Sequence, residues 1–582
     1  MPPVAIRILP PEVASRIAAG EVVERPASIV KELVENALDA GATRISVEAN
    51  EGGVALIRVV DDGCGIEPDE LPLAFSRHAT SKLAADADLD AIATLGFRGE
   101  ALPSVAAVAE VEAVSRQHDS PAAGRVRISF GEFRAQGSAG SPPGTSISVR
   151  NLFREQPARL KFLRSPGAEA SQIASVVSHY ALAYPEVAFS LRLDGRDAFS
   201  TAGSGSAREA AAGVYGREVA AAMLDVGDQD EAHSLEALIA PPHVSRANRS
   251  YVTIFINRRW VRSRSLSYAV EEAYSGMLQT GRFPIAIVDL RLPPGEVDVN
   301  VHPAKAEVRL RNERQVFALV QRPIRAALAG LAPAGAEALT AWPRAPLTLS
   351  PPAYQFSVPS YPPTPGAGGP LQSDLAPQRR FEPEAAQPSL PAAMPILRPL
   401  GQAGTTYVIA EGPSGLYLVD QHAAHERVMY ERFLSHLGAF DAPAQPLLSP
   451  IVLELAPAQA ALIMTFSGAL AEHGFTVEPF GGGGYLLRAA PAGLRREDPA
   501  RAFLELLDLL TREDAPADPR HRVAASLACH AAVRAGQTLA PEEMRDLIEQ
   551  LEACKAPQTC PHGRPTMLHL SAEELARRFA RR

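Results

Sequence analysis

The stretch that decides the fold is IVKELVENALDAG, residues 29–41. Its apolar residues, such as Ile29 and Leu33, recur at helical spacing and predict an amphipathic helix with one buried stripe. Glu32, Asn36 and Asp39 stand at i, i+4 and i+7 and therefore share a second, polar face. Spacing alone leaves two interpretations of this face open, a ligand-binding surface and an ordinary solvated one.

Segments around this helix alternate apolar and polar residues as strands do. RISVEAN (44–50), ALIRVVDD (55–62) and TSISVRNLF (145–153) are such segments. A second set starts at SYVTIFINRRWV (250–261) and closes on a predicted helix at RQVFALVQRPIRAALAG (314–330). Strands and helices that interleave in this way indicate an α+β multidomain protein whose first domain is an α/β sandwich.

The chain has 582 residues, which is too long for one hydrophobic core, so several domains are expected. Residues 331–400 hold 16 of the 51 prolines and show no periodicity, which is typical of a disordered linker. The predicted divisions are a first α/β domain at 1–215, a second α/β domain at 216–332, a linker at 333–393 and a C-terminal α/β domain at 394–582.

Composition describes an ordinary protein, with 46% hydrophobic and 21% charged residues. No stretch approaches the roughly 18 uncharged apolar residues of a membrane helix, and prolines and charges interrupt the N-terminus before a signal peptide could form. We expect a cytoplasmic, nucleoid-associated protein with no membrane partner. The net charge of −9 does not exclude DNA binding, because phosphate contact depends on local patches.

Four short motifs follow the first helix in order. Asp61-Asp62-Gly63-Cys64-Gly65 ends a strand with carboxylates and glycines, which suits a turn where backbone approaches a ligand closely. HATSKL (78–83), GFRGEAL (96–102) and PPGTSISV (142–149) come next. A glycine-rich loop that opens a helix offers free N–H groups to phosphate, although each motif alone is a weak signal.

Together these motifs resemble the ATP-binding motifs of the GHKL superfamily, and AAGEVVERPASIVKELVENALDAGATRI is similar to the MutL family of bacterial mismatch-repair proteins. The resemblance implies that Glu32 activates the attacking water and that Asn36 holds Mg²⁺, for which an amide oxygen is a suitable ligand. Asp61 would accept a hydrogen bond from the adenine amino group of ATP, with support from the Thr145 hydroxyl. Asp39 and Gly65 belong to the same nucleotide-binding set.

The resemblance also assigns further residues to the binding of the ATP phosphates. A lid around the phosphates would comprise Gly96, Phe97, Arg98 and Gly99, with Lys82 nearby. DVNVHPAKAEVRL (298–310) in the second domain would bring Lys305 to the γ-phosphate, a point contact that suits a compact ammonium.

The C-terminal domain contains LYLVDQHAAHERVMYERFL (416–434), where a predicted strand ends at Asp420 and a helix begins. His422 and Glu426 stand at i and i+4, a spacing that allows two side chains of one helix to bind one metal. An exposed charged face is the alternative. The segment fits D-Q-H-A-x-x-E-x-x-x-x-E from Asp420 to Glu431, which resembles the endonuclease motif of MutL proteins that nick DNA. That resemblance makes Asp420 and Glu426 catalytic candidates.

Three of the four cysteines fall within the last 54 residues, which favours metal binding over disulfides. Cys529 lies in ACHAAVRAG, and Cys560 and His562 lie in CPHGRPT. Sulfur and imidazole favour Zn²⁺, whereas carboxylates favour Mn²⁺ or Mg²⁺. His425 is interpreted as a surface residue and Cys554 as a small buried hydrophobe. The predicted metal ligands are Asn36, Asp420, His422, Glu426, Cys529, Cys560 and His562.

Two further segments predict partners. The arginines at 258, 259, 262 and 264, beside Trp260, suit salt-dependent and sequence-independent contact with double-stranded DNA, although a solvated face is equally compatible. The four residues are Arg258, Arg259, Arg262 and Arg264. Gln445, Leu448 and Pro450 resemble a peptide that binds the replication sliding clamp, with an ordinary loop as the alternative. The family implies a homodimer and a MutS mismatch-recognition partner.

Three functions therefore compete. The first is a mismatch-repair ATPase with its own metal-dependent nicking endonuclease. The second is an ATP-switched matchmaker without nuclease activity, which the complete 420–431 and CPHGRP segments oppose. The third is another GHKL ATPase, such as a chaperone or topoisomerase subunit, which DVNVHPAKAEV opposes.

Overall fold

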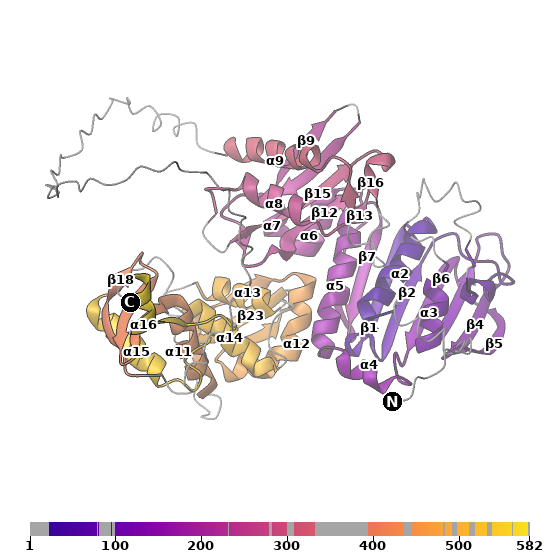
Figure 1. Ribbon diagram of the computed structural model, residues 1–582. Coiled ribbons are helices and arrows are strands. Elements are labelled where there is room, and N and C mark those ends of the chain that lie inside the picture. The colour runs from indigo at the N-terminus through magenta and orange to yellow at the C-terminus, as the bar shows by residue number, and fades with distance from the viewer. Residues whose placement is uncertain are drawn as a thin grey trace, which may run out of the picture.

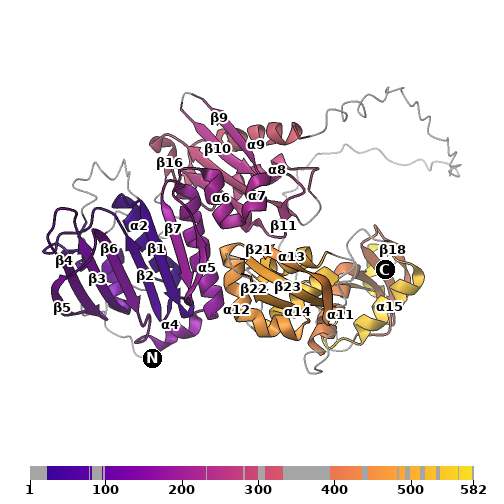
Figure 2. The same ribbon diagram turned by 180° about the vertical axis from the view of Figure 1, so that it is seen from behind.

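The structure is a computed structural model of the whole chain (Figures 1 and 2). It describes residues 23–77, 79–80, 95, 99–230, 232–278, 282–298, 308–331, 394–435, 444–480, 484–491, 498–510, 518–531, 538–561 and 563–579. The linker predicted at 333–393 lies outside them. Within these ranges, no helix combines the length and apolar character that crossing a membrane requires.

An eight-stranded mixed sheet forms the first domain, with helices packed on it (Figure 1). Its order is β5-β4-β3-β6-β2-β1-β7-β8, and only β1 and β7 pair in parallel among the pairs described. The strands are β1 (Arg44–Asn50), β2 (Leu56–Asp61), β3 (Glu110–Arg116), β4 (Ala123–Ser129), β5 (Glu132–Ala139), β6 (Gly144–Arg150), β7 (Ala188–Leu193) and β8 (Arg196–Ser200). The helices are α2 (Pro26–Asp39), α3 (Ala101–Val108), α4 (Pro157–Phe162) and α5 (Pro166–Ala183). The predicted α/β sandwich is confirmed.

Helix α2 is the helix that the sequence predicts, and local chemistry sets both of its ends. Pro26 occupies its first turn, where a missing N–H costs nothing. Gly41 follows its end with φ +71, and the amides of Gly41 and Ala42 donate to the carbonyls of Leu38 and Ala37. This is the Schellman arrangement, which satisfies the last carbonyls of a helix. The apolar stripe is buried against the sheet, whereas the residues of the polar face remain partly exposed.

The second sheet has five strands in the order β13-β12-β15-β10-β9, covered by two helices. Its strands are β9 (Leu224–Gln229), β10 (Ser234–Ile239), β12 (Val252–Ile256), β13 (Arg259–Trp260) and β15 (Ala286–Arg291). The covering helices are α8 (Arg264–Ala273) and α9 (Glu313–Ala329), and α6 (Ala207–Tyr215) and α7 (Arg217–Ala222) precede the sheet. Two small ladders join β11 (Ser245–Arg246) to β14 (Phe283–Pro284) and β16 (Val297–Asp298) to β17 (Arg309–Leu310).

The C-terminal region has two cores. The first combines the sheet β18-β19-β20-β24 with helices α11 and α15; its elements are β18 (Arg398–Ala403), β19 (Tyr407–Gly412), β20 (Gly415–Asp420), α11 (Gln421–Ser435), α15 (Pro541–Glu552), β24 (Met567–Ser571) and α16 (Ala572–Arg578). The second, which we call the inserted subdomain (444–531), contains the sheet β21-β23-β22. Its elements are β21 (Ala444–Glu454), α12 (Pro457–Glu472), β22 (Thr476–Pro479), β23 (Gly484–Pro491), α13 (Pro499–Leu510) and α14 (Pro519–Ala531). In both views α12 lies beside α5 of the first domain (Figures 1 and 2).

Candidate functional site

The polar face of α2 is half-buried rather than solvated. Glu32, Asn36 and Asp39 are all of intermediate exposure, and the Glu32 side chain is 26% exposed. Asp39 Oδ1 accepts a hydrogen bond from the Leu95 amide at 2.9 Å, and Lys31 Nζ lies 3.7 Å from Glu32 Oε1. The face is therefore open to a ligand in part, and its role in binding stays a prediction.

Asp61 ends β2 and is tied to the neighbouring strand and turn. Its Oδ1 accepts the amide of Gly63 at 2.9 Å and that of Thr145 at 3.3 Å. Asp61 and Thr145 are also direct partners in the β2–β6 register. Burial raises the pKa of Asp61 above its ordinary value, and the negative charge of Asp62 adds to this rise, although the hydrogen bonds from the two amides oppose it. The structure thus brings together the two residues that the sequence assigned to the adenine contact.

Two glycines at this turn cannot be replaced without a clash. Gly144 has φ +113, and a Cβ there would lie 2.1 Å from the Asp61 carbonyl oxygen. Gly65 has φ +73, and its Cβ would lie 2.1 Å from the Arg116 carbonyl oxygen. Both positions combine a backbone conformation that L-residues avoid with a close approach of another strand. The two glycines therefore allow the backbones of β2, β3 and β6 to approach closely near Asp61 and Thr145.

Ser115 is a site residue that sequence reasoning missed. It is fully buried on β3, where its hydroxyl accepts the Ile66 amide at 2.8 Å, lies 2.9 Å from Thr145 Oγ1 and reaches the Gly144 carbonyl at 3.3 Å. One hydroxyl thus fixes the turn after Asp61 and the side chain of Thr145. Its signal in the sequence is a serine at the inward position of the alternating strand EVEAVSR.

The carboxylate of Asp62, unlike that of Asp61, binds the start of β1. It accepts the amides of Thr43 and Arg44 and the Thr43 hydroxyl at 2.7–2.8 Å, and these bonds hold its pKa below the ordinary value although burial acts in the opposite direction. A cavity of about 620 Å³ is lined by Asp62, Gly63, Cys64 and Gly41, among others. This cavity shares the turn with Asp61, but Glu32, Asn36 and Asp61 are not among its lining residues.

Several predicted nucleotide ligands lie outside the described residues. They are Lys82, Gly96, Phe97, Arg98 and Lys305. Gly99 is described, two residues before the start of α3, and has φ +61. The predicted lid and the γ-phosphate lysine therefore stay predictions.

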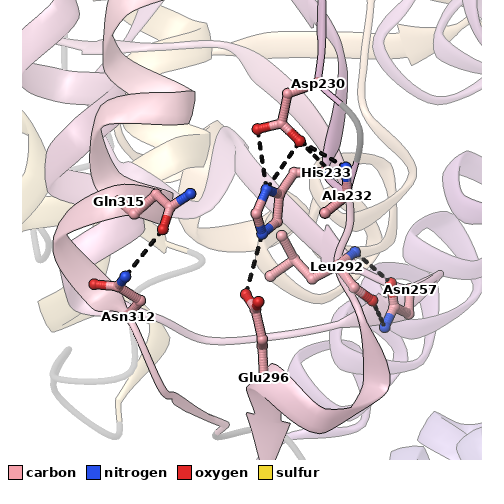
Figure 3. A network of polar contacts seen from close by, with 8 residues as sticks. All are labelled: Asp230, Ala232, His233, Asn257, Leu292, Glu296, Asn312 and Gln315. Carbon is pink, nitrogen blue, oxygen red and sulfur yellow. Dashed lines mark hydrogen bonds and ion pairs between the residues drawn. The ribbon is translucent and has the colours of Figure 1, made fainter.

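The β16–β17 ladder, which flanks the Lys305 segment, is described, and the side chain of His233 stabilises it through a polar contact that we call the His233 brace (Figure 3). His233 is buried between two carboxylates: its Nδ1 lies 3.0 Å from Asp230 Oδ2 and its Nε2 lies 3.1 Å from Glu296 Oε2. Hydrogen bonds to Asp230 and Glu296 raise the pKa of His233. Glu296 directly precedes β16, so the brace joins the β9–β10 turn to the β16–β17 ladder.

The arginine patch of the second domain divides in two. Arg258 forms an ion pair with Glu186 and lies over the Tyr184 ring, so its charge is already matched. Arg262 is exposed and lies over Trp260, and Arg264 at the start of α8 is exposed as well. Arg259, on β13, is of intermediate exposure.

Asp420 closes β20 and caps α11, as the sequence predicts for the strand–helix junction. Its Oδ1 accepts the amides of His422 at 2.9 Å and Ala423 at 3.1 Å. His422 Nε2 lies 3.2 Å from Glu426 Oε1, and the Glu426 side chain is only 6% exposed. The His422 imidazole and the buried Glu426 carboxylate are close enough to share a divalent cation, whereas Asp420 binds the first amides of the helix and forms no described group of three with them.

The loop that carries Cys560 is held against α11. Glu431 accepts the amides of Lys555 at 2.6 Å and Ala556 at 3.0 Å, and Arg427 donates to the Thr559 carbonyl. Cys560 itself is buried. Cys529 lies on α14, which packs against α11, but its side chain and the whole of His562 are outside the described residues. Among the side chains that are described, no three His, Cys, Asp or Glu residues form a group that could hold a metal.

Two smaller predictions concern His425 and Cys554. His425 was interpreted as a surface residue, but it is only partly exposed, and burial lowers its pKa. Its partial exposure is compatible with a place at the surface of α11, which α14 and α15 cover in part. Cys554 is half-buried against the core of α11 and α15, and burial raises its pKa to about 11. It therefore fits the predicted role of a small packing residue.

The predicted clamp peptide stands out from its sheet. Gln445, Leu448 and Pro450 are exposed on β21, with a relative accessibility of 107% for Leu448. The β21–β23 register shifts between Pro446 and Ile451, so the intervening residues leave the regular ladder. An apolar side chain held this far into solvent is available to a partner.

Three family models match the chain. "Histidine kinase-, DNA gyrase B-, and HSP90-like ATPase" matches residues 21–150, "DNA mismatch repair protein, C-terminal domain" matches 211–329, and "MutL C terminal dimerisation domain" matches 400–539. The first contains α2, β2 and β6. The third contains β20, α11 and the inserted subdomain.

Curated relatives match along the whole chain. The DNA mismatch repair protein MutL of Symbiobacterium thermophilum is 42% identical over 99% of this chain and 100% of its own length. That of Desulforudis audaxviator is 42% identical over 99% of each chain. A solved structure, the Aquifex aeolicus MutL ATPase domain complexed with ADP, is 27% identical and covers 47% of this chain and 94% of its own, with a TM-score of 0.38. With the nucleotide motifs and the three matched regions in family order, the two curated relatives show that the chain belongs to the MutL family of DNA mismatch repair proteins.

Proposed function

We propose that the chain is a mismatch-repair ATPase that also nicks DNA through a metal-dependent endonuclease site in its C-terminal domain. The ATPase half of the proposal rests on the half-buried polar face of α2 and on the Asp61–Thr145 pair at the end of β2. The nuclease half rests on one observation above all, the buried Glu426 beside His422 on the helix whose first amides Asp420 binds.

In the nucleotide site, the residues divide the work by position. Glu32 would accept the proton of the attacking water, and Asn36, one turn further along α2, would offer an amide oxygen to Mg²⁺. The backbone amides of Gly63 and Thr145 donate to the same oxygen of Asp61, and they would orient its carboxylate toward the adenine amino group. Ser115 orients Thr145 beside it. Lys305 would complete the site at the γ-phosphate.

In the C-terminal site, Asp420, His422 and Glu426 would hold a catalytic Mn²⁺ or Mg²⁺, and Cys529, Cys560 and His562 would hold Zn²⁺. Such cations polarise the phosphoryl oxygen and lower the pKa of bound water. The chain's own contribution is positional: Asp420 is fixed by two helix amides, and Arg427 and Glu431 keep the Cys560 loop against α11.

The decisive experiment is Asp420→Asn in the full-length chain, assayed for nicking of supercoiled DNA with Mn²⁺. Asparagine is as good a helix cap as aspartate, so α11 should persist while the carboxylate charge is lost. We expect nicking to fall to the level without enzyme and ATP hydrolysis to be unchanged. His425→Gln, on the same helix but outside the pattern, is the matched control and should nick normally. Unchanged nicking by Asp420→Asn would refute the nuclease site.

We further propose that exposed Leu448, with Gln445 and Pro450, binds the replication sliding clamp. The homodimer, the MutS partner and contact with double-stranded DNA through Arg262 and Arg264 complete the proposed assembly. Gln445→Ala should remove the stimulation of nicking by the clamp and leave basal nicking as it was. Ser449→Ala, within the same exposed segment, should retain the stimulation. Equal stimulation in both variants would count against the clamp contact.

A further inference from the structure

The inserted subdomain (444–531) lies against the N-terminal half of the chain, and the contact has a built polar centre. In both views α12 faces α5, and α13 lies below the second sheet (Figures 1 and 2). Asp508 of α13 has no exposed surface. Its Oδ1 accepts the hydroxyl of Tyr251 at 2.8 Å, and its carbonyl accepts the Asn248 side chain at 3.0 Å. Both partners are more than 200 residues away in sequence, and both are buried.

The network is closed from the side of the subdomain as well. Gln459 at the start of α12 donates to the same Asp508 oxygen at 2.6 Å and is itself 2% exposed. Burial raises the pKa of Asp508, while the nearby Arg246 and the hydrogen bonds act against that rise. A carboxyl group removed from water is costly unless it is hydrogen-bonded, and here the donors come from both sides of the contact. This pattern specifies one relative placement of the two halves.

Around this centre, further contacts extend the surface. Arg282 forms an ion pair with Glu505, one turn before Asp508 on α13. The Arg217 amide donates to Glu454 Oε2 at 2.8 Å, and Arg196 Nη1 lies 3.0 Å from Met464 Sδ.

The contact is also apolar and close. Ala456, Ala458 and Ala461 pack against the core of the first domain. At Gly167 of α5, an added Cβ would lie 1.5 Å from Thr465 Oγ1, so backbone and side chain meet without a gap. A glycine at the crossing of two helices allows this approach.

We propose that the inserted subdomain binds the N-terminal half of its own chain through this surface, with Asp508, Tyr251, Asn248 and Gln459 at its centre. The occupant is the segment 444–531 of the same chain, because its Glu505 and Asp508 match Arg282 and Tyr251 in charge and hydrogen bonding and its Thr465 fits against Gly167. The docked placement leaves the exposed Leu448 segment accessible. The proposal is independent of the nuclease and clamp proposals and can fail without them.

Cross-linking in the full-length chain tests the docking directly. Arg196→Cys with Met464→Cys places two thiols at an exposed edge of the contact, where a short bismaleimide can join them. The control is Arg134→Cys with Met464→Cys, because Arg134 lies on β5 at the opposite edge of the first sheet. The chain without added cysteines gives the background from Cys64, which is exposed.

We expect an intramolecular product that forms at least about tenfold faster than in the control pair, because docking raises the effective concentration of the two thiols. Equal rates in the two pairs would overturn the proposal. A product that joins two chains would overturn the assignment to a single chain.

Charge reversal separates the contact from folding. Glu505→Arg places a cation against Arg282 and should lower the cross-linking rate about tenfold, and adding Arg282→Glu should restore it. Glu472→Arg, on α12 but paired with Arg520 within the subdomain, is the matched control and should have no effect. A rate after Glu505→Arg equal to that control would contradict the proposal.

If the swapped pair stays slow, Tyr251→Phe decides the matter. This variant removes one buried hydroxyl from the N-terminal side and leaves α13 untouched. A rate several-fold lower supports docking through Asp508. An unchanged rate overturns it.

Discussion

The Ser115 hydroxyl offers the sharpest test of how the adenine end of the nucleotide site is built. Ser115→Ala removes three contacts, to the Ile66 amide, to Thr145 Oγ1 and to the Gly144 carbonyl, at a position with no exposed surface. A buried amide without an acceptor costs about 1–3 kcal/mol. Water cannot replace the hydroxyl unless a cavity opens, so we expect about 2 kcal/mol of lost stability in the first domain.

Nucleotide affinity should fall as well, but by less. Thr145 keeps its backbone bond to Asp61 and loses only the partner that orients its hydroxyl. One weakened hydrogen bond is worth about 1 kcal/mol, which is roughly a fivefold rise in the Kd for ADP. ADP is the preferred probe because it excludes any effect on hydrolysis.

Titration calorimetry with ADP and scanning calorimetry of the full-length chain measure the two effects. Ser138→Ala is the matched control, because Ser138 is exposed on the edge strand β5 of the same sheet. The reasoning is refuted if Ser115→Ala binds ADP and unfolds as the Ser138 variant does. A loss of affinity without a loss of stability would also contradict it, because both effects come from one hydroxyl.

Three further predictions concern other parts of the chain. Glu32→Ala should reduce the rate of ATP hydrolysis by about 10²–10⁴-fold, as loss of a general base does, while the Kd for ATP in an equilibrium binding assay stays within a few-fold; undiminished turnover would remove Glu32 from this role. Tyr180→Phe should destabilise the first domain by about 1–2 kcal/mol in scanning calorimetry, because the Tyr180 hydroxyl donates to the buried Glu35 at 2.6 Å; a shift no larger than for Ser138→Ala would contradict it. The His233 brace should depend on pH: its raised pKa means that its stabilisation is complete below the ordinary value of 6.5 and is lost as pH rises through the higher folded value. The difference in melting temperature between the chain and His233→Gln should therefore shrink from pH 6 to pH 8, and a constant difference would show that the brace does not titrate.

Local elements were predictable because short-range patterns determine them. The helix at 29–41 is read from its apolar spacing and its terminal glycine, and the junction at Asp420 is read from a strand that ends on a capping residue. Asp61 and Thr145 could be paired only through the family resemblance, since they are 84 residues apart. The sheet register that joins them is a property of the folded chain.

The remainder could not be predicted because it depends on contacts between distant segments. On α13, Glu505 and Asp508 share a face opposite the buried Leu506, Leu507 and Leu510, so helical periodicity predicts a solvated polar face. The structure covers that face with residues around Tyr251. Arg258 shows the same limit, because the sequence cannot reveal that Glu186 already neutralises it.

The position of α5 between two other helices has a consequence for how movements could spread through the chain. It packs against α2 on one side and α12 on another, and small residues make up much of its sequence, PGAEASQIASVVSHYALA. Glycine and alanine have no rotamers with which to absorb a shift, and the close-packed interior leaves little free space. A displacement of α12 would therefore move α5 as a rigid body. The close packing of these helices depends on small side chains along α5, and a single larger side chain there would disrupt it.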